Sequence, residues 1–424
     1  MYFELIIFLV MVAVFMIGCF KFKLPVGIAM VLAAISGSLV SGNGISVRHL
    51  IEGSFGYIDT ILVIATAMIF MKVVEASGAL HALSSVIINR FHKRPAILLI
   101  FLMLVVMFPG MITGSSTAAV LTAGSLVAPV FLMLGIPAVN TAAIIAVGGM
   151  MGMIAPPVNV PVMIIGSGID MPYVGFGLPL LLMSVPIAIF TVLFLGHKYA
   201  HKTSYAELKE NLDFDLDKKY GLLVYLPLFV VLSLMLLTKI LPQYIPNLGL
   251  PLIFLLGSLI GIFTGERFNI FKKVKEAISD ALPVLGILVG VGMFIQIMTL
   301  TGVRGLIVVN SISLPMALLY IGIAITIPLF GAISSYGSAS VLGVPFILAL
   351  LSQDQIITAG ALSLIASLGD LMPPTALAGL FAAQVVGVDN YVQVLKKTAV
   401  PAIVINVAGI IFIIFANQLA GILF

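Results

Sequence analysis

Residues 110–116, with the sequence GMITGSS, interrupt a long apolar stretch, and residues 331–338, with the sequence GAISSYGS, interrupt another one 221 positions later. Glycine lets a chain reverse, and serine and threonine hydroxyls pair with backbone groups that leave a helix. Inside a bilayer, such irregular backbone is tolerated only where it is buried in protein or lines a cavity. Each cluster therefore predicts the tip of a re-entrant hairpin.

The sequence around these clusters is typical of a membrane protein. Of the 424 residues, 62% are hydrophobic and 8% are charged, whereas soluble domains carry about 25% charged residues. Apolar runs of about 20 residues, the length that crosses a bilayer as a helix, recur along the chain. We expect an all-α polytopic membrane protein in contact with the lipid bilayer. The net charge of +4 comes from basic residues in short loops, so it predicts no nucleic-acid partner.

Two double prolines form a second pair of interruptions. Pro156-Pro157 and Pro373-Pro374 are 217 positions apart. Proline removes a helix donor and disfavours the helical conformation in the residue before it, so two in a row stop a helix. Both lie in apolar segments that are too long for aqueous loops, which predicts two broken transmembrane helices. The carbonyls freed at each break, with Asn159 or Thr375 nearby, are oxygen ligands suited to Na⁺.

The matching order of the interruptions predicts an internal duplication. We expect a first repeat over 1–196, a cytoplasmic linker over 197–220, which is the only long polar stretch, and a second repeat over 221–424. The predicted hairpins lie near 95–135 and 315–352, and the predicted broken helices lie near 139–170 and 356–390.

The basic residues of the loops predict how the repeats are oriented. The loop 43–56 carries one basic residue and its counterpart 264–279 carries four. The bias reverses after the next span, where 79–94 carries three and 303–314 carries one. Because basic loops face the cytoplasm, the two repeats are predicted to be inverted in the membrane, which is typical of secondary transporters.

Asp370 is the most informative charged residue. It lies at the end of an apolar run without a basic neighbour in sequence, and an intramembrane carboxylate is by default a functional-site hypothesis. It would complete a cation site or carry a proton; alternatively, the segment ends earlier and Asp370 faces water. We interpret Lys72 and Glu75 as a local pair at the end of a span, and Asp59 and Asp280 as helix starts at an interface.

These features predict a substrate site and an overlapping cation site, with the packing of close helices as the alternative reason for the small residues. The predicted substrate-binding residues are Thr113, Gly114, Ser115, Ser116, Ser334, Ser335, Tyr336, Gly337 and Ser338. The predicted cation ligands are Ser115, Ser116, Pro156, Asn159, Ser335, Asp370, Pro373 and Thr375. Motifs of hydrolases, metalloproteases and nucleotide-binding enzymes are absent from the sequence, so we do not expect an enzyme.

The chain resembles the large membrane subunit of tripartite ATP-independent periplasmic (TRAP) transporters. The resemblance rests on GMITGSS at 110–116, IAPP at 154–157, MPP at 372–374 and the ALP of 281–283, which leads to Thr301-Gly302-Val303. It implies a scaffold and an elevator-type transport domain with two hairpins, in the bacterial inner membrane. It also implies Na⁺-coupled uptake of a small organic anion bearing a carboxylate, with a four-helix small membrane subunit and a periplasmic solute-binding protein as partners.

The sequence departs from the family pattern in the second half. The second tip reads Ser-Ser-Tyr-Gly-Ser where the family has an acidic residue, proline and glycine, and Asp370 stands where the family has an apolar residue. The alternative function is a stand-alone organic-anion carrier or exchanger of the same superfamily, coupled to Na⁺ or H⁺, without a binding protein. A membrane enzyme or a non-transporting scaffold is the third hypothesis, and the missing catalytic motifs argue against it.

Overall fold

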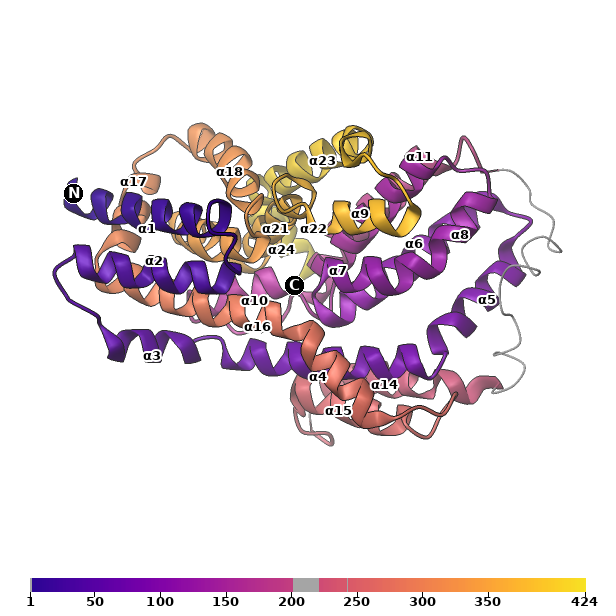
Figure 1. The fold of residues 1–424 in the computed structure, drawn as a ribbon. Coiled ribbons are helices and arrows are strands. Elements are labelled where there is room, and N and C mark those ends of the chain that lie inside the picture. Colours follow the sequence, from indigo (N-terminus) through magenta and orange to yellow (C-terminus); the bar gives the residue numbers. More distant parts are fainter. Residues whose placement is uncertain (1, 201–220, 242) are drawn as a thin grey trace.

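The chain is described by a computed structural model that covers residues 2–200, 221–241 and 243–424. Within these residues every regular element is a helix and none is a strand (Figure 1). The predicted linker 197–220 lies mostly outside the described residues.

The first half contains eleven α-helices and one π-helical turn. They are α1 (Tyr2–Phe20), α2 (Val26–Val40), α3 (Val47–Phe55), α4 (Ile58–Ala76), α5 (Ala79–Phe91), α6 (Pro95–Thr113), α7 (Ser116–Ala119), the π-turn η1 (Val120–Gly124), α8 (Ser125–Met133), α9 (Ala138–Ile154), α10 (Val160–Ser167) and α11 (Gly177–Gly196).

The described part of the second half begins with a 3₁₀ turn and repeats this theme. Its elements are η2 (Gly221–Tyr225), α14 (Leu226–Ile240), α15 (Gly249–Gly261), α16 (Ile270–Leu300), α17 (Val303–Ile312), α18 (Met316–Gly331), α19 (Ser335–Ser338), the π-turn η3 (Ala339–Gly343), α20 (Val344–Ala349), α21 (Gln355–Ser367), the 3₁₀ turn η4 (Leu368–Leu371), α22 (Leu377–Val386), α23 (Tyr391–Ile414) and α24 (Ala416–Leu423).

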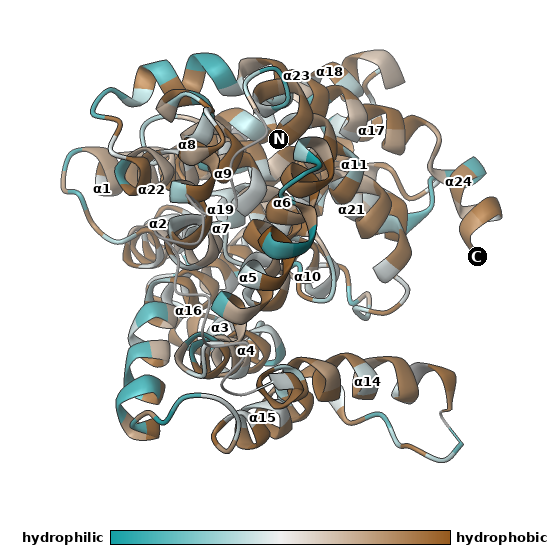
Figure 2. Cartoon of the chain, turned by 90° about the vertical axis from the view of Figure 1, so that its right-hand side faces the viewer, coloured by the Kyte–Doolittle hydropathy of each residue, from teal (hydrophilic) through white to brown (hydrophobic). Residues whose placement is uncertain are grey.

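The lengths and the surfaces of these helices confirm a multi-pass membrane protein. Among the described residues, seven helices are long and apolar enough to cross a bilayer, or eight if α3 and α4, bent by 44°, count as one span. Large apolar side chains such as Phe229 and Leu236 of α14 are more than half exposed. Figure 2 shows brown, apolar residues over the outer helices. Only lipid or another protein can cover such a surface.

The order of elements in the first half recurs in the second. A long helix, α4 or α16, is followed by a short helix, a hairpin and a helix that stops at a double proline. Gly78 follows α4 with φ 83°, and Gly302 follows α16 with φ 75°. Both angles lie in the left-handed region, which glycine adopts without a steric penalty. The same turn therefore joins equivalent helices in both halves.

Three segments treated as loops in the sequence analysis are helical. Residues 43–56, 79–94 and 303–314 contain α3, α5 and α17, which pack against α16, α6 and α20. Each buries only one face, so none shows the continuous apolar run of a spanning helix. The loop 264–279 likewise contains the start of α16, which continues from Ile270 to Leu300 with Pro283 inside it.

The helices form two packed groups (Figure 1). In the first group, α16 packs against α2, α3 and α4, and α15 packs against α4 and α14. In the second group, α9 packs against α6, α11, α22 and α23, while α21 packs against α10, α11 and α23. Every residue of α9 from Asn140 to Ile154 is buried. The second group thus encloses both helices that end at a double proline.

Candidate functional site

The tip of the first hairpin lies between α6 and α7. Gly114 takes a left-handed conformation with φ 64° after the last helical residue, Thr113. The Thr113 hydroxyl donates to the carbonyl of Pro109 at 2.7 Å and accepts from the amide of Ser115 at 3.2 Å. Ser115 then caps the next helix, because its hydroxyl accepts from the amide of Ala118 at 3.2 Å. The hydroxyls thus pair with backbone groups freed by the reversal, as the sequence predicts.

The tip of the second hairpin is built in the same way and touches the first. Ser334 caps α19, and its hydroxyl accepts from the amide of Gly337 at 3.0 Å. The Tyr336 hydroxyl donates to the carbonyl of Gly114 in the other tip at 2.9 Å. The two hairpin tips, 222 positions apart in sequence, are therefore in direct contact.

Equivalent hydrogen bonds tie each broken helix to its own hairpin. In the first half, the amide of Val158 donates to the carbonyl of Met111 at 3.1 Å. In the second half, the amide of Thr375 donates to the carbonyl of Ala332 at 3.3 Å, and its hydroxyl donates to the same oxygen at 2.7 Å. These pairs stand at the offsets of 221 and 217 positions that relate the two clusters and the two double prolines.

Glycines bring each hairpin against the helix that breaks beside it. A Cβ on Gly369 would lie 2.2 Å from the carbonyl oxygen of Gly331, and one on Gly110 would lie 2.9 Å from the backbone of Gly152. Real Cβ atoms do not approach that closely, so any side chain at Gly369 would force α18 away from η4. The small residues thus also allow close packing, the alternative role considered for them.

Asp370 links the two hairpin tips. Its side chain lies in η4 and is 5% exposed, so it is buried within the protein rather than on the outer surface. One carboxylate oxygen accepts a hydrogen bond from the Ser116 hydroxyl of the first tip, and Ser335 of the second tip lies beside the carboxylate and lines the same cavity. Within the described chain no lysine or arginine pairs with it. A buried carboxylate held by hydroxyls alone still lacks a partner for its charge.

A cavity of about 570 Å³ opens beside this carboxylate. Seven of the fourteen predicted site residues line it: Ser115, Ser116, Ser334, Ser335, Tyr336, Asp370 and Thr375. The remaining walls come from α4, α16 and α22, with Val26 of α2 and further residues of the first hairpin in α7 and η1. The cavity therefore lies between the two groups of helices, with both tips on one side and α4 and α16 on the other.

The other predicted residues do not line this cavity. They are Thr113, Gly114, Gly337, Ser338, Pro156, Asn159 and Pro373. Asn159 is fully buried: its amide group donates to the Ile154 carbonyl at 2.8 Å and to Ser363 at 3.0 Å, and its side-chain oxygen accepts from Val162 at 2.9 Å. The side chain of Asn159 thus links the helix break at 154–159 to α21, and its oxygen caps α10.

Three charged residues at the cavity rim were not predicted as site residues. Lys72 of α4 lies 3.0 Å from Asp280 of α16 and 3.4 Å from Glu75, and all three line the cavity. The spacing of Lys72 and Glu75 by one helical turn is explained by a local pair, so it gives no sign of the cavity. The contact with Asp280, far away in sequence, arises only from the packing of α4 on α16.

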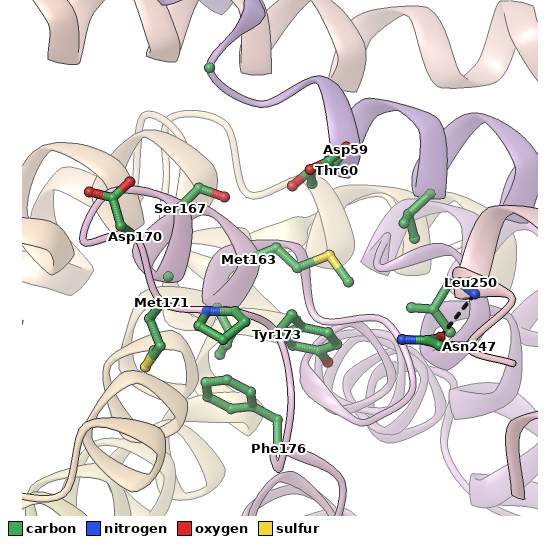
Figure 3. Close-up of a pocket in the computed structure, with 16 residues that line it drawn as sticks. Asp59, Thr60, Met163, Ser167, Asp170, Met171, Tyr173, Phe176, Asn247 and Leu250 are labelled. Atoms are coloured by element: carbon green, nitrogen blue, oxygen red, sulfur yellow. Dashed lines mark hydrogen bonds between the residues drawn. The ribbon is translucent and has the colours of Figure 1, made fainter. Parts of the chain in front are cut away.

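A second cavity, of about 550 Å³, lies at the opposite end of α4 (Figure 3). Asp59 and Thr60 line it from the first turn of α4, and Asp170 lines it from the loop after α10. Tyr173 stacks on Phe176 with ring centres 5.1 Å apart, and its hydroxyl accepts from the backbone amide of Asn159 at 3.2 Å. This cavity therefore reaches the first break from the side away from the hairpin tips.

Comparison with solved structures shows that the fold is shared with other membrane proteins. The Alcanivorax borkumensis YdaH transporter superposes with a TM-score of 0.62 over 86% of each chain at 14% identity. Neisseria gonorrhoeae MtrF, from a class of antimetabolite efflux pumps, superposes with a TM-score of 0.61 over 88% of this chain and 84% of its own at 15% identity. Identities this low establish the architecture alone. No curated protein sequence matches the chain.

The amino-acid sequence itself assigns the chain to a protein family. Residues 9–419 match the DctM component of the tripartite ATP-independent periplasmic transporters, and the chain belongs to this family. It is a membrane transporter and not an enzyme. The family implies a TRAP system, in which a small membrane subunit and a periplasmic binding protein work with this chain.

Proposed function

We propose that this chain imports a small organic carboxylate across the bacterial inner membrane and that Na⁺ entry drives the import. The proposal rests above all on one feature: Asp370, a buried carboxylate without a basic partner in the described chain, joins two hydroxyl-rich hairpin tips beside a cavity. Its charge requires a cation, and the tips offer hydrogen-bond donors to an anion in the same place.

The charges along the cavity favour cation coupling. The described lining carries three carboxylates, those of Glu75, Asp280 and Asp370, and one ammonium, that of Lys72. With all four ionised, the cavity is negative and repels an organic anion. A Na⁺ ion bound at Asp370 and the serine hydroxyls, all hard oxygen ligands, removes part of this repulsion. Binding of the cation and binding of the anion then favour each other.

We propose Asp370, Ser116 and Ser335 as the primary cation ligands, with Thr375 and freed carbonyls at 372–374 close by. The equivalent break at 154–159 is the proposed place of a second ion. There the carbonyls of the segment, including that of Pro156, are the proposed ligands, since the Asn159 side chain is committed to α10 and α21.

The proposed mechanism moves the second group of helices, with both tips, against the first. The cavity rim at Lys72, Glu75 and Asp280 lies next to the basic segments 79–94 and 264–279. Because such segments face the cytoplasm, the cavity represents an inward-open state in this proposal. A movement of the tips past α4 and α16, away from the cytoplasmic face, would expose the same site to the periplasmic face of the membrane, as inverted repeats permit.

Uptake by the assembled system tests this proposal. The chain is reconstituted in proteoliposomes with its small membrane subunit, the loaded binding protein is added outside, and uptake of labelled solute is followed with Na⁺ or choline as the external cation. We expect uptake in Na⁺ and less than a tenth of that rate in choline. Equal uptake in choline would refute the coupling, and a proton gradient imposed at fixed Na⁺ identifies H⁺ as the driving ion if uptake follows it. Uptake without binding protein would favour a stand-alone carrier.

A further inference from the structure

We propose that the transported solute is a monocarboxylate with an apolar body, rather than a dicarboxylate or a polyhydroxy acid. The inference rests on the proposed function and specifies the substrate class of the same cavity. It comes from the residues of α4, α16 and α22 that line the cavity, of which the transport proposal uses only the charged ones.

The charges of the cavity lining favour a solute that carries a single negative group. Lys72 is the only basic residue of the described lining, and two carboxylates, Asp280 at 3.0 Å and Glu75 at 3.4 Å, already neutralise it. The donors at the tips and a cation at Asp370 can receive one carboxylate. A second carboxylate on the solute would face Glu75 and Asp280 without a partner, and like charges at this range repel each other.

Apart from Lys72, Glu75, Ser279 and Asp280, the residues of α4 and α16 that line the cavity are apolar. Met68 and Met71 of α4 line it with side chains that are 5% and 3% exposed, and Val284 and Ile287 of α16 continue it. Phe381 of α22 adds an aromatic ring to the lining. Methionine adapts its shape to different apolar groups, so this wall suits a hydrocarbon body of variable form.

The same wall disfavours hydroxyl groups on the solute. A solute hydroxyl directed at the thioethers and methyl groups of this wall exchanges water for atoms that cannot form a normal hydrogen bond, which costs binding free energy. A methylene group in the same position instead gains about fourfold in affinity for each one that leaves water. The cavity therefore discriminates by the body of the solute as well as by its charge.

This inference is tested with six-carbon acids, two of which differ from hexanoate in one property each. The probes are hexanoate, its dicarboxylate counterpart adipate and its hydroxylated counterpart gluconate, with acetate and butyrate as a chain-length series. Affinity is measured in Na⁺ by thermal shift of the detergent-purified chain with its small membrane subunit. We expect affinity to rise up to fourfold with each added methylene, and hexanoate to bind at least ten times more tightly than adipate or gluconate.

Substitutions in the apolar part of the cavity lining distinguish an effect on solute selectivity from an effect on protein stability. Met71→Gln should lower the ratio of hexanoate to gluconate affinity about tenfold, whereas Met71→Leu should leave it unchanged. Met298→Gln is the matched control, because Met298 is buried in α16 away from the cavity lining. It should lower the melting temperature without changing the ratio. Ratios measured within one variant cancel any general loss of stability.

The outcomes distinguish the inference from the proposed function. If adipate or gluconate binds as tightly as hexanoate, the inference is overturned and the proposal of carboxylate transport still stands. The same holds if the ratio of hexanoate to gluconate affinity in Met71→Gln equals that of the unsubstituted protein. If none of the five acids shifts the melting temperature in Na⁺ although the protein is folded, carboxylate binding itself fails and the proposed function is overturned with it.

Discussion

Replacing Asp370 by asparagine removes the charge at the centre of the site and keeps its shape. The side chain is 5% exposed, accepts a hydrogen bond from Ser116 of the first tip and lies beside Ser335 of the second. An amide can replace this bond, since a serine hydroxyl can donate or accept. An interaction with a buried charged group contributes about 1.5–3 kcal/mol, which corresponds to a loss of about 10- to 150-fold in apparent Na⁺ affinity. Without Na⁺ the variant should be as stable as the unsubstituted protein or more stable, because an uncompensated buried charge is gone.

The assay is the melting temperature of the purified complex as a function of Na⁺ concentration, accompanied by uptake in proteoliposomes. The midpoint of the Na⁺-dependent rise should move to higher concentration in Asp370→Asn, and uptake should fall with it. Asp389→Asn is the control, because Asp389 is an exposed aspartate in the same half. A normal Na⁺ midpoint together with normal uptake in Asp370→Asn would show that this carboxylate is structural only.

Three further experiments test the architecture of the site. Gly369→Val places a side chain against the Gly331 carbonyl, where a Cβ would already be 2.2 Å away, so size-exclusion chromatography should show no monodisperse protein. Tyr336→Phe removes the hydrogen bond between the tips, and a melting temperature a few degrees lower, from a loss of about 1 kcal/mol, should accompany slower uptake. A double-mutant cycle of Lys72→Met and Asp280→Asn should give a coupling of at most about 1 kcal/mol, because Asp280 is 54% exposed and water screens the pair.

The irregular segments of the fold were predictable because they are encoded locally. A double proline stops a helix wherever it occurs, and glycine with serine marks a reversal. The ends of α9 and α21 and the turns at 114–115 and 332–334 follow from those residues alone. The short helices α3, α5 and α17 were missed because their stability comes from packing one face on α16, α6 and α20, a tertiary effect that leaves no long apolar run.

The site was predicted only in part for a similar reason. Asp370 could be identified because a carboxylate in an apolar run is costly without a function. Its pairing with Ser116, 254 positions away, requires the two halves to be placed face to face. The roles of Lys72 and Met71 depend on which side of α4 faces the tips, and α4 is apolar all round, so its sequence does not reveal a preferred face.

The two cavities explain why α4 carries charge at both of its ends. Asp59 lies in one cavity and Lys72 in the other, and thirteen residues of helix separate them by about 20 Å. Two hydrogen bonds hold α10 and its carboxyl end next to residues that line the second cavity: the Tyr57 hydroxyl donates to the Ile164 carbonyl at 3.5 Å, and Arg304 donates to the Gly168 carbonyl at 2.5 Å. In the proposed transport cycle these bonds, at the carboxyl end of α10, must break when the tips move toward Asp59. The end of α10 would thus hold the second cavity apart from the substrate site while the tips face Lys72, which is the separation that alternating access requires.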